Sequence, residues 1–280
     1  MVIKEALLYG EKNLSNNLYT DPINESRKIL SFLLSKDLSF IYIYPEYLLD
    51  EYTRDKFIEI IEKRKNGLPL EYIFHEKNFF GRDFFVDERV LIPRWDTENL
   101  VNEVIKLAKS IVSPKILEIG AGSGAISLTL GMEIRNSSVL GVDISNKALE
   151  VCEINKNIFN IENVSFIYSD LFSNVKGKYD IIVSNPPYIK TEELIALQRE
   201  VTCEPINALD GGEDGLYYYK HIIKKSINHI TDNGILAFEI GHDQGNRVKE
   251  LLEENKFKNI EIKKDLQGLD RVIWGVKEGI

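Results

Sequence analysis

Cysteine is scarce in this chain of 280 residues, which contains only Cys152 and Cys203. Two cysteines are too few for a disulfide scaffold or a structural zinc site. The four histidines are scattered, and none has a carboxylate or cysteine at metal-ligand spacing. The sequence therefore predicts no metal site.

Long apolar runs are also missing. No stretch approaches the roughly 18 apolar residues of a membrane span, and the acidic residues Glu5 and Glu11 are unlike those of a signal peptide. We therefore expect a cytoplasmic protein with no membrane partner.

Positive charge is in deficit, because 35 Lys+Arg stand against 44 Asp+Glu and give a net charge of −9. An acidic surface repels phosphate backbones at long range, although a local basic groove can still exist. We expect no direct nucleic-acid partner, and we expect a monomer. The composition is otherwise that of a globular protein, with 44% hydrophobic and 28% charged residues.

Residues 1–75 carry helical patterns. In the segment 22–35, the side chains expected to share one face are Ile23, Arg27, Leu30 and Leu34. In the segment 51–67, they are Phe57, Ile60, Ile61 and Arg64. The sequence predicts a small helical domain, and its residues leave packing and partner recognition open as roles.

A second domain is expected over 76–280. Aromatic residues on both sides of Gly81 indicate a β-hairpin linker near 77–92. Asp96 or Thr97 can then cap a helix that continues to residue 111.

Strands and helices alternate from residue 115 onward, which predicts an α/β, Rossmann-like fold with a mostly parallel sheet covered by helices on both faces. The expected strands are 115–122, 138–145, 164–170, 178–188, 234–241, 258–265 and 271–277, and the last two form a hairpin. The expected helices are 125–133, 146–159 and 221–230. Ligands of such sheets bind beyond the carboxyl ends of the strands.

A glycine-rich turn follows the first of these strands. It consists of Gly120, Ala121, Gly122, Ser123 and Gly124, preceded by Glu118. Glycines let the backbone approach a ligand closely, but the pattern alone fits both dinucleotides and methyl donors. The dinucleotide fingerprint G-x-G-x-x-G is not met.

Two further strand ends supply polar groups. Asp143 ends the second strand, and its carboxylate can accept hydrogen bonds from both hydroxyls of a ribose. Asp170, Leu171 and Phe172 follow the third strand and can meet the edge and face of an adenine. Any strand needs an end, so this third signal is weak by itself.

The most specific motif is Asn185-Pro186-Pro187-Tyr188, which follows an apolar strand. Two prolines stiffen the backbone and hold Asn185 extended. The Asn185 side-chain oxygen and the Pro186 carbonyl can accept both hydrogens of a planar NH₂ group, and Tyr188 can cover its face. Since amide nitrogens are poor nucleophiles, positioning must supply most of the acceleration.

In this order, Glu118–Gly124, Asp143 and Asn185–Tyr188 resemble a class I S-adenosylmethionine-dependent N-methyltransferase. The flanking segments 79–98 and 203–220 resemble the HemK/PrmC family of release-factor glutamine methyltransferases. Two positions depart from the family pattern: Trp95 replaces a usual proline, and the turn has Glu118 and Ala121 where Asp and Thr are frequent.

The resemblance implies methylation of the side-chain amide nitrogen (N5) of the glutamine in the GGQ motif of class I peptide chain release factors. It implies S-adenosyl-L-methionine as cofactor and S-adenosyl-L-homocysteine as product. It also implies a cofactor site at Gly120, Ala121, Gly122, Ser123, Gly124, Asp143, Asp170, Leu171 and Asn185. The catalytic residues would be Asn185, Pro186 and Tyr188, with Pro187 also in the substrate site.

Three alternatives remain. An adenine-N6 DNA or RNA methyltransferase would act on the same kind of NH₂ group, but the sequence has no basic stripe near the motif. A ribosomal-protein glutamine methyltransferase would differ only in its N-terminal domain. A non-catalytic binding module is disfavoured by the intact motifs. Residues 190–215 are either a lid over the substrate or a surface connection.

Overall fold

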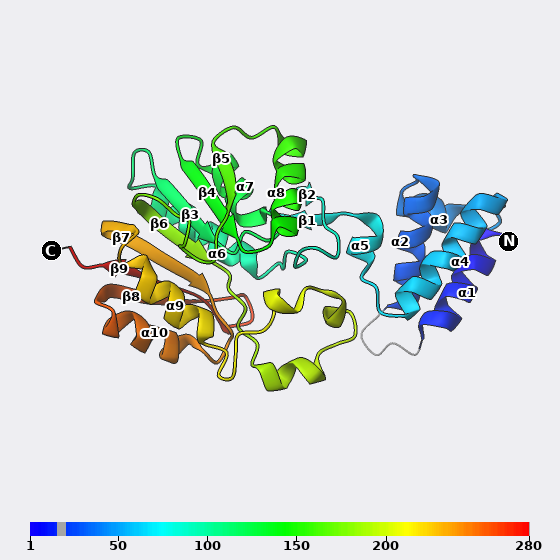
Figure 1. The fold of residues 1–280 in the computed structure, drawn as a ribbon. Coiled ribbons are helices and arrows are strands. Elements are labelled where there is room, and N and C mark those ends of the chain that lie inside the picture. Colours follow the sequence, from blue (N-terminus) through cyan, green and yellow to red (C-terminus); the bar gives the residue numbers. More distant parts are fainter. Residues whose placement is uncertain (16–20, 280) are drawn as a thin grey trace. The chain divides into compact units, whose positions relative to one another are not determined.

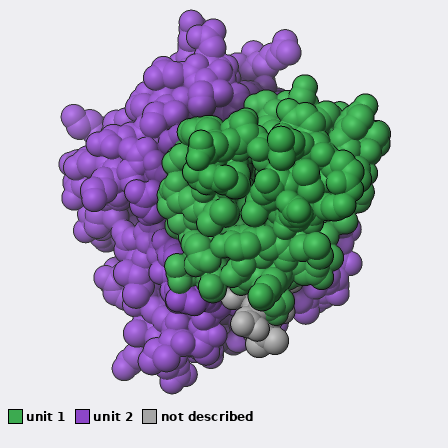
Figure 2. All heavy atoms as spheres, turned by 90° about the vertical axis from the view of Figure 1, so that its right-hand side faces the viewer, with its two compact units in different colours: residues 1–75 green, residues 76–280 purple. Residues whose placement is uncertain are grey.

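The computed structural model describes residues 1–15 and 21–279. The chain divides into two compact units, Met1–His75 and Glu76–Ile280, which are coloured separately in Figure 2. Each unit has a hydrophobic core of its own. No helix within the described residues combines the length and apolar character needed to cross a bilayer.

Unit 1 is a group of helices: α1 (Ile3–Leu14), α2 (Pro22–Leu34), α3 (Leu38–Ile43), α4 (Glu51–Lys65) and α5 (Leu70–Phe74). The face predicted for α4 is confirmed, since Phe57, Ile60, Ile61 and Arg64 are all buried. Arg64 reaches into the core because the Glu25 carboxylate accepts two hydrogen bonds from it, of 2.8 and 2.9 Å.

The face predicted for α2 is wrong by about one position along the helix. Its buried residues are Ser26, Ile29 and Leu30, whereas Ile23, Arg27 and Leu34 are only half-buried. The small Ser26 faces Gly10 of α1 so closely that a side chain on Gly10 would lie 2.1 Å from the Ser26 hydroxyl. Close packing of two helices, rather than apolar periodicity, therefore selects this face.

Unit 2 begins with a short antiparallel hairpin of β1 (Lys77–Phe79) and β2 (Arg82–Phe84). A seven-stranded sheet follows, in the order β5-β4-β3-β6-β7-β9-β8 (Figure 1). Its strands are β3 (Lys115–Ile119), β4 (Ser138–Asp143), β5 (Val164–Tyr168), β6 (Tyr179–Ser184), β7 (Ile230–Glu239), β8 (Phe257–Lys264) and β9 (Asp270–Lys277). Only β9 runs against its neighbours, so the predicted mostly parallel sheet is confirmed.

Helices cover both faces of this sheet. On one face, α6 (Thr97–Ala108) and α7 (Ala125–Glu133) pack with the hairpin aromatics, and α8 (Asn146–Phe159) contacts β4 and β5. On the other face lie α9 (Tyr217–Ser226) and α10 (Gly245–Glu254). The helix predicted over 221–230 is wrong in its bounds: α9 starts four residues earlier, and Ile230 already pairs with Tyr179 as a strand residue.

The order in which the chain adds strands to the sheet reverses between the neighbouring strands β3 and β6. After β3 it moves outward through β4 and β5, and it then returns to add β6 on the other side of β3. Such a switch leaves the carboxyl ends of two neighbouring strands open, and this is where sheets of this kind bind ligands.

Candidate functional site

A cavity of about 350 Å³ lies at these carboxyl ends. Residues that follow β3, β4, β5 and β6 line it, together with residues from 89–97 and from 205–222. Of the residues predicted from sequence to form a site, those that line the cavity are Gly120, Ala121, Gly122, Ser123, Asp143, Asp170, Leu171, Asn185, Pro186 and Pro187. The sequence motifs thus meet in one place.

The glycine turn has backbone torsion angles that only glycine adopts readily. Gly120, Gly122 and Gly124 have φ values of +81°, +56° and +79°. A side chain built on Gly120 or Gly122 would meet no atom within 4 Å, whereas one on Gly124 would lie 3.1 Å from Phe166. The first two glycines therefore leave open space beside the backbone, while Gly124, which does not line the cavity, allows α7 to pack.

Asp143 is fixed by the turn that it faces. One carboxylate oxygen accepts a hydrogen bond of 2.9 Å from the Gly122 N–H, and the other accepts one of 2.8 Å from the Ser145 N–H. Burial raises the pKa of Asp143, and these two N–H groups act in the opposite direction. The carboxylate is therefore pre-oriented at the wall of the cavity as a hydrogen-bond acceptor.

Glu118 brings a second carboxyl group to the same cavity. It is buried, and it accepts hydrogen bonds from the Ser127 hydroxyl and from the Ser127 N–H, the latter of 2.9 Å. Burial raises the pKa of Glu118 to about 8, and the charge of Asp143 adds to the effect. Near neutral pH the Glu118 carboxyl group is therefore mostly protonated, and a bound cation would favour its charged form.

The turn after β5 presents Asp170 and Leu171 to the cavity. Leu171 has a φ of +50°, which is unusual for a residue with a side chain. The Ser169 hydroxyl holds this turn, because it donates to the Leu171 carbonyl at 2.8 Å and accepts from the Asn174 N–H at 3.0 Å. The hydrogen bonds of Ser169 thus fix the shape of this turn, which the sequence alone did not indicate.

The Asn-Pro-Pro corner follows β6 directly. The Ser184 hydroxyl donates to the Ile119 carbonyl at 2.6 Å and so ties the ends of β6 and β3 together. The Asn185 side-chain NH₂ donates to the Thr97 hydroxyl at 3.1 Å. Asn185, Pro186 and Pro187 all line the cavity next to the glycine turn.

Tyr188 lies differently from what the motif suggested. It does not line the cavity, and its side chain packs against the core beneath α9 and α10. Burial raises the pKa of Tyr188 to about 12. Its carbonyl accepts a hydrogen bond of 3.0 Å from the Gln244 side chain, so Tyr188 anchors the corner in this structure.

Part of the segment 190–215 forms a wall of the cavity. This segment contains three short 3₁₀ helices, η1 (Thr191–Ala196), η2 (Val201–Cys203) and η3 (Ile206–Ala208), and Pro205, Asn207 and Ala208 line the cavity. Glu204 is buried, accepts a hydrogen bond of 3.0 Å from the Ile92 N–H and pairs with Arg94. The segment is therefore more than a surface connection.

Trp95, the residue that departs from the family pattern, is 62% exposed and does not line the cavity. The ammonium of Lys77 lies 5.9 Å from the centre of its ring. Asp96 occupies the N-cap position of α6 without a side-chain cap bond and instead lies 3.3 Å from Arg271. The expected capping of α6 by Asp96 or Thr97 side chains is thus wrong.

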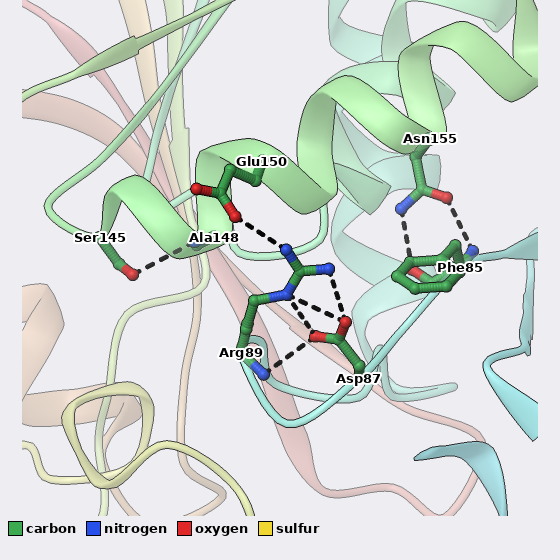
Figure 3. A network of polar contacts seen from close by, with 7 residues as sticks. All are labelled: Phe85, Asp87, Arg89, Ser145, Ala148, Glu150 and Asn155. Atoms are coloured by element: carbon green, nitrogen blue, oxygen red, sulfur yellow. Dashed lines mark hydrogen bonds and ion pairs between the residues drawn. The ribbon is translucent and has the colours of Figure 1, made fainter. Parts of the chain in front are cut away.

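Sequence reasoning missed a polar network behind the glycine turn (Figure 3). The buried Asn155 amide exchanges hydrogen bonds of 2.7 and 2.9 Å with the backbone of Phe85, and it donates one of 2.9 Å to the Ser123 carbonyl. Arg89 lines the cavity and is held by Asp87 and Glu150. An asparagine inside an amphipathic helix gives no signal of such a role.

No group of three or more His, Cys, Asp or Glu side chains that could hold a metal ion occurs in the part of the chain that the structure describes. The cavity offers backbone N–H groups, the carboxyl groups of Glu118, Asp143 and Asp170, and the acceptors of the Asn-Pro-Pro corner. Its chemistry is therefore that of binding and orienting an organic ligand.

Comparisons with known proteins agree with this arrangement. Residues 5–74 match the family model for the PrmC N-terminal domain, and residues 97–213 match that for the methyltransferase small domain. A release factor glutamine methyltransferase from Fusobacterium nucleatum is 42% identical over 94% of this chain and 76% of its own length. Another from Clostridium acetobutylicum is 38% identical over the full length of both chains.

The chain belongs to the release factor glutamine methyltransferase family. The resemblance found in the sequence is thereby confirmed, and the protein is a methyltransferase. Among solved structures, a methyltransferase from Pyrococcus furiosus has a TM-score of 0.54 at 18% identity and covers 72% of this chain and 92% of its own. A likeness at this low identity supports only the fold, which is a Rossmann-like sheet of the kind found in methyltransferases.

Proposed function

We propose that this protein transfers the methyl group of S-adenosyl-L-methionine to the side-chain amide nitrogen of the glutamine in the GGQ motif of class I peptide chain release factors. The observation that carries the proposal is the meeting of the Asn-Pro-Pro corner with the glycine turn and Asp143 in one cavity. Membership of the family supports the choice of substrate.

The residues of the cavity fit the cofactor. Open space beside Gly120 and Gly122 leaves room for a ligand against the backbone, and Asp143 presents acceptors suited to two ribose hydroxyls. Leu171 offers an apolar surface for an adenine ring, with Asp170 at its edge. Glu118 also lines the cavity, and a ligand that carries a sulfonium and an ammonium group would favour its charged form, because a nearby cation lowers the pKa of a carboxyl group.

The cofactor, when bound, supplies an electrophilic methyl group. The protein's own part is to hold the glutamine amide, whose nitrogen is a poor nucleophile because its lone pair is delocalised into the carbonyl. Asn185 and Pro186 provide the Oδ1 and carbonyl acceptors for the two amide hydrogens. These acceptors orient the nitrogen and stabilise positive charge that develops on it. Tyr188, anchored by Gln244, and Pro187 keep the corner rigid.

The test is transfer of label from isotopically labelled cofactor. Release factor should be labelled, whereas release factor with alanine in place of the GGQ glutamine, DNA and RNA should not. Fragment mass spectrometry should place the methyl group on that glutamine. Equal labelling of both proteins, or labelling of adenine in DNA or RNA, would refute the proposal.

We further infer that unit 1 recognises the release factor. The match to the PrmC N-terminal domain supports this role, as do exposed aromatic side chains, which include Tyr42 and Tyr52 at 58% and 71% exposure. Aromatic residues of this kind often anchor protein interfaces. Replacing Tyr52 with alanine should raise KM for the release factor and leave kcat unchanged. An unchanged KM for several such variants would remove this role.

A further inference from the structure

A buried carboxyl group joins two segments of the cavity wall that are far apart in the sequence. The side chain of Glu204 is only 2% exposed. One of its oxygens accepts a hydrogen bond of 3.0 Å from the Ile92 N–H, and the other is paired with the guanidinium of Arg94. Since Ile92 lies 112 residues before Glu204, this contact links the segment 89–97 to the segment 190–215.

The residues next to this contact line the cavity. Leu91 and Pro93 flank Ile92 in the sequence, and both are lining residues. Pro205, which follows Glu204 directly, is another. Glu204 itself does not line the cavity, so its carboxylate lies behind the place where the two wall segments meet.

Both wall segments also contact the Asn-Pro-Pro corner. The first segment ends at Thr97, whose hydroxyl accepts a hydrogen bond of 3.1 Å from the Asn185 NH₂ group. The second segment returns to the corner at Gly211, whose N–H donates a hydrogen bond of 2.7 Å to the Ile189 carbonyl. The corner is therefore held from two sides, and the segments that hold it are tied to each other at the buried carboxylate.

The chemistry of Glu204 suits a contact that fixes a position. Removing a carboxylate and a guanidinium from water costs free energy, and well-packed apolar side chains can stabilise a protein as much or more. Apolar contacts have no preferred direction, however, whereas hydrogen bonds from an N–H and a guanidinium do. The contact therefore determines how the two segments lie against each other more than it adds stability.

The cofactor side of the cavity is held by other bonds. The Gly122 N–H joins the glycine turn to Asp143, and the Ser169 hydroxyl holds the turn at Leu171. The two segments tied by Glu204 contact the corner instead, where the glutamine amide is proposed to bind. A change at Glu204 should therefore disturb the methyl acceptor more than the methyl donor.

We propose that Glu204 is a positioning residue, which holds the wall segments 91–97 and 205–211 where they confine the glutamine side chain beside Asn185. This inference rests on the proposed function, since it concerns the methyl acceptor. A misplacement of reacting groups by about 1 Å can lower a rate about a hundredfold, so a small shift of the wall is enough.

The first test compares Glu204→Gln, which keeps an acceptor for the Ile92 N–H but loses the charge, with Glu204→Ala, which loses both. We expect kcat for the release factor to fall about tenfold to a hundredfold in Glu204→Ala and less in Glu204→Gln. The Kd for S-adenosyl-L-homocysteine should stay within about threefold of wild type in both. Rates are compared well below each melting temperature, because loss of a buried partner also destabilises the protein.

Glu133→Gln is the matched control. It removes an ion pair of 2.6 Å with Arg82 that also joins distant segments but does not line the cavity. Its kcat should equal that of wild type. A wild-type kcat in Glu204→Ala, or a Kd for S-adenosyl-L-homocysteine that rises as much as kcat falls, would overturn the inference.

A second test does not depend on activity. Hydrogen exchange of backbone amides, followed by mass spectrometry, should become faster in the segments 89–97 and 204–211 of Glu204→Ala. It should stay unchanged at 120–124 and throughout Glu133→Gln. Unchanged exchange in both wall segments of Glu204→Ala would refute the positioning role. A wild-type protein that methylates no release factor would reject the proposed substrate, and faster exchange in the wall segments of the variant would still support the role of Glu204.

Discussion

The N–H group of Gly122 donates a hydrogen bond of 2.9 Å to the carboxylate of Asp143, and so joins the turn after β3 to the end of β4. The cavity wall proposed to bind the cofactor is therefore held in place by the protein's own hydrogen bonds. Prearranged groups bind more tightly, because less ordering is needed when the ligand arrives.

Replacing Asp143 with alanine should chiefly weaken cofactor binding. The change removes the acceptors proposed for two ribose hydroxyls, and hydrogen bonds to a charged group contribute roughly 1.5–3 kcal/mol each. We expect the Kd measured by calorimetry to rise about a hundredfold or more. Glu153→Ala, which removes an exposed acid from α8, is the control and should bind normally. Unchanged affinity in Asp143→Ala would show that the ribose assignment is wrong.

Stability should depend on pH through Glu118. Its pKa is raised from 4.5 to about 8 in the folded state, so the folded protein binds a proton that the unfolded chain has lost in this interval. The resulting stabilisation is complete below pH 4.5 and disappears as the pH rises through 8. The free energy of unfolding should therefore fall between pH 5 and 8, by a few kcal/mol at most.

Glu118→Gln is the variant that isolates this contribution, since glutamine does not titrate in this range. Denaturant unfolding at pH 5.5 and at pH 8 should show a smaller difference between the two pH values in the variant than in wild type. The same difference in both proteins would contradict the assignment.

Asn155 should be important for stability although it touches no ligand. Asn155→Leu preserves size but removes the three hydrogen bonds that Asn155 makes with the N–H and carbonyl of Phe85 and with the carbonyl of Ser123. One such hydrogen bond contributes about 0.5–1.5 kcal/mol, so we expect a loss of roughly 3 kcal/mol in the free energy of unfolding. Asn157→Leu, an exposed position on the same helix, should be nearly neutral. Equal effects of the two changes would mean that the network in Figure 3 contributes little.

Much of the fold could be predicted because local patterns agree with the tertiary structure. The helices Ala125–Glu133 and Asn146–Phe159 have the bounds predicted for them, and the sheet has the predicted strands. The pattern failed where a tertiary contact decided the outcome. Ser26 is buried because of Gly10, and α9 ends early because Ile230 belongs to β7.

The site could be predicted in part for the same reason. Motifs that follow parallel strands must meet at one edge of the sheet, so the convergence of Gly120, Asp143 and Asn185 on one cavity could be predicted from their positions. Thr97 was expected to cap α6, but its side chain contacts Asn185, which is 88 residues away in the sequence. The sequence of α6 alone does not reveal which strand end the helix contacts.

The most direct test of the whole account is the rate of methyl transfer by Asn185→Ala, measured together with its affinity for the cofactor. Asn185 is proposed to align the glutamine amide, so transfer to the release factor should be abolished while the Kd for the cofactor stays within about tenfold of wild type, or about 1.4 kcal/mol. Transfer at a substantial rate, or loss of cofactor binding as the main effect, would contradict the claim that this corner holds the amide for methylation.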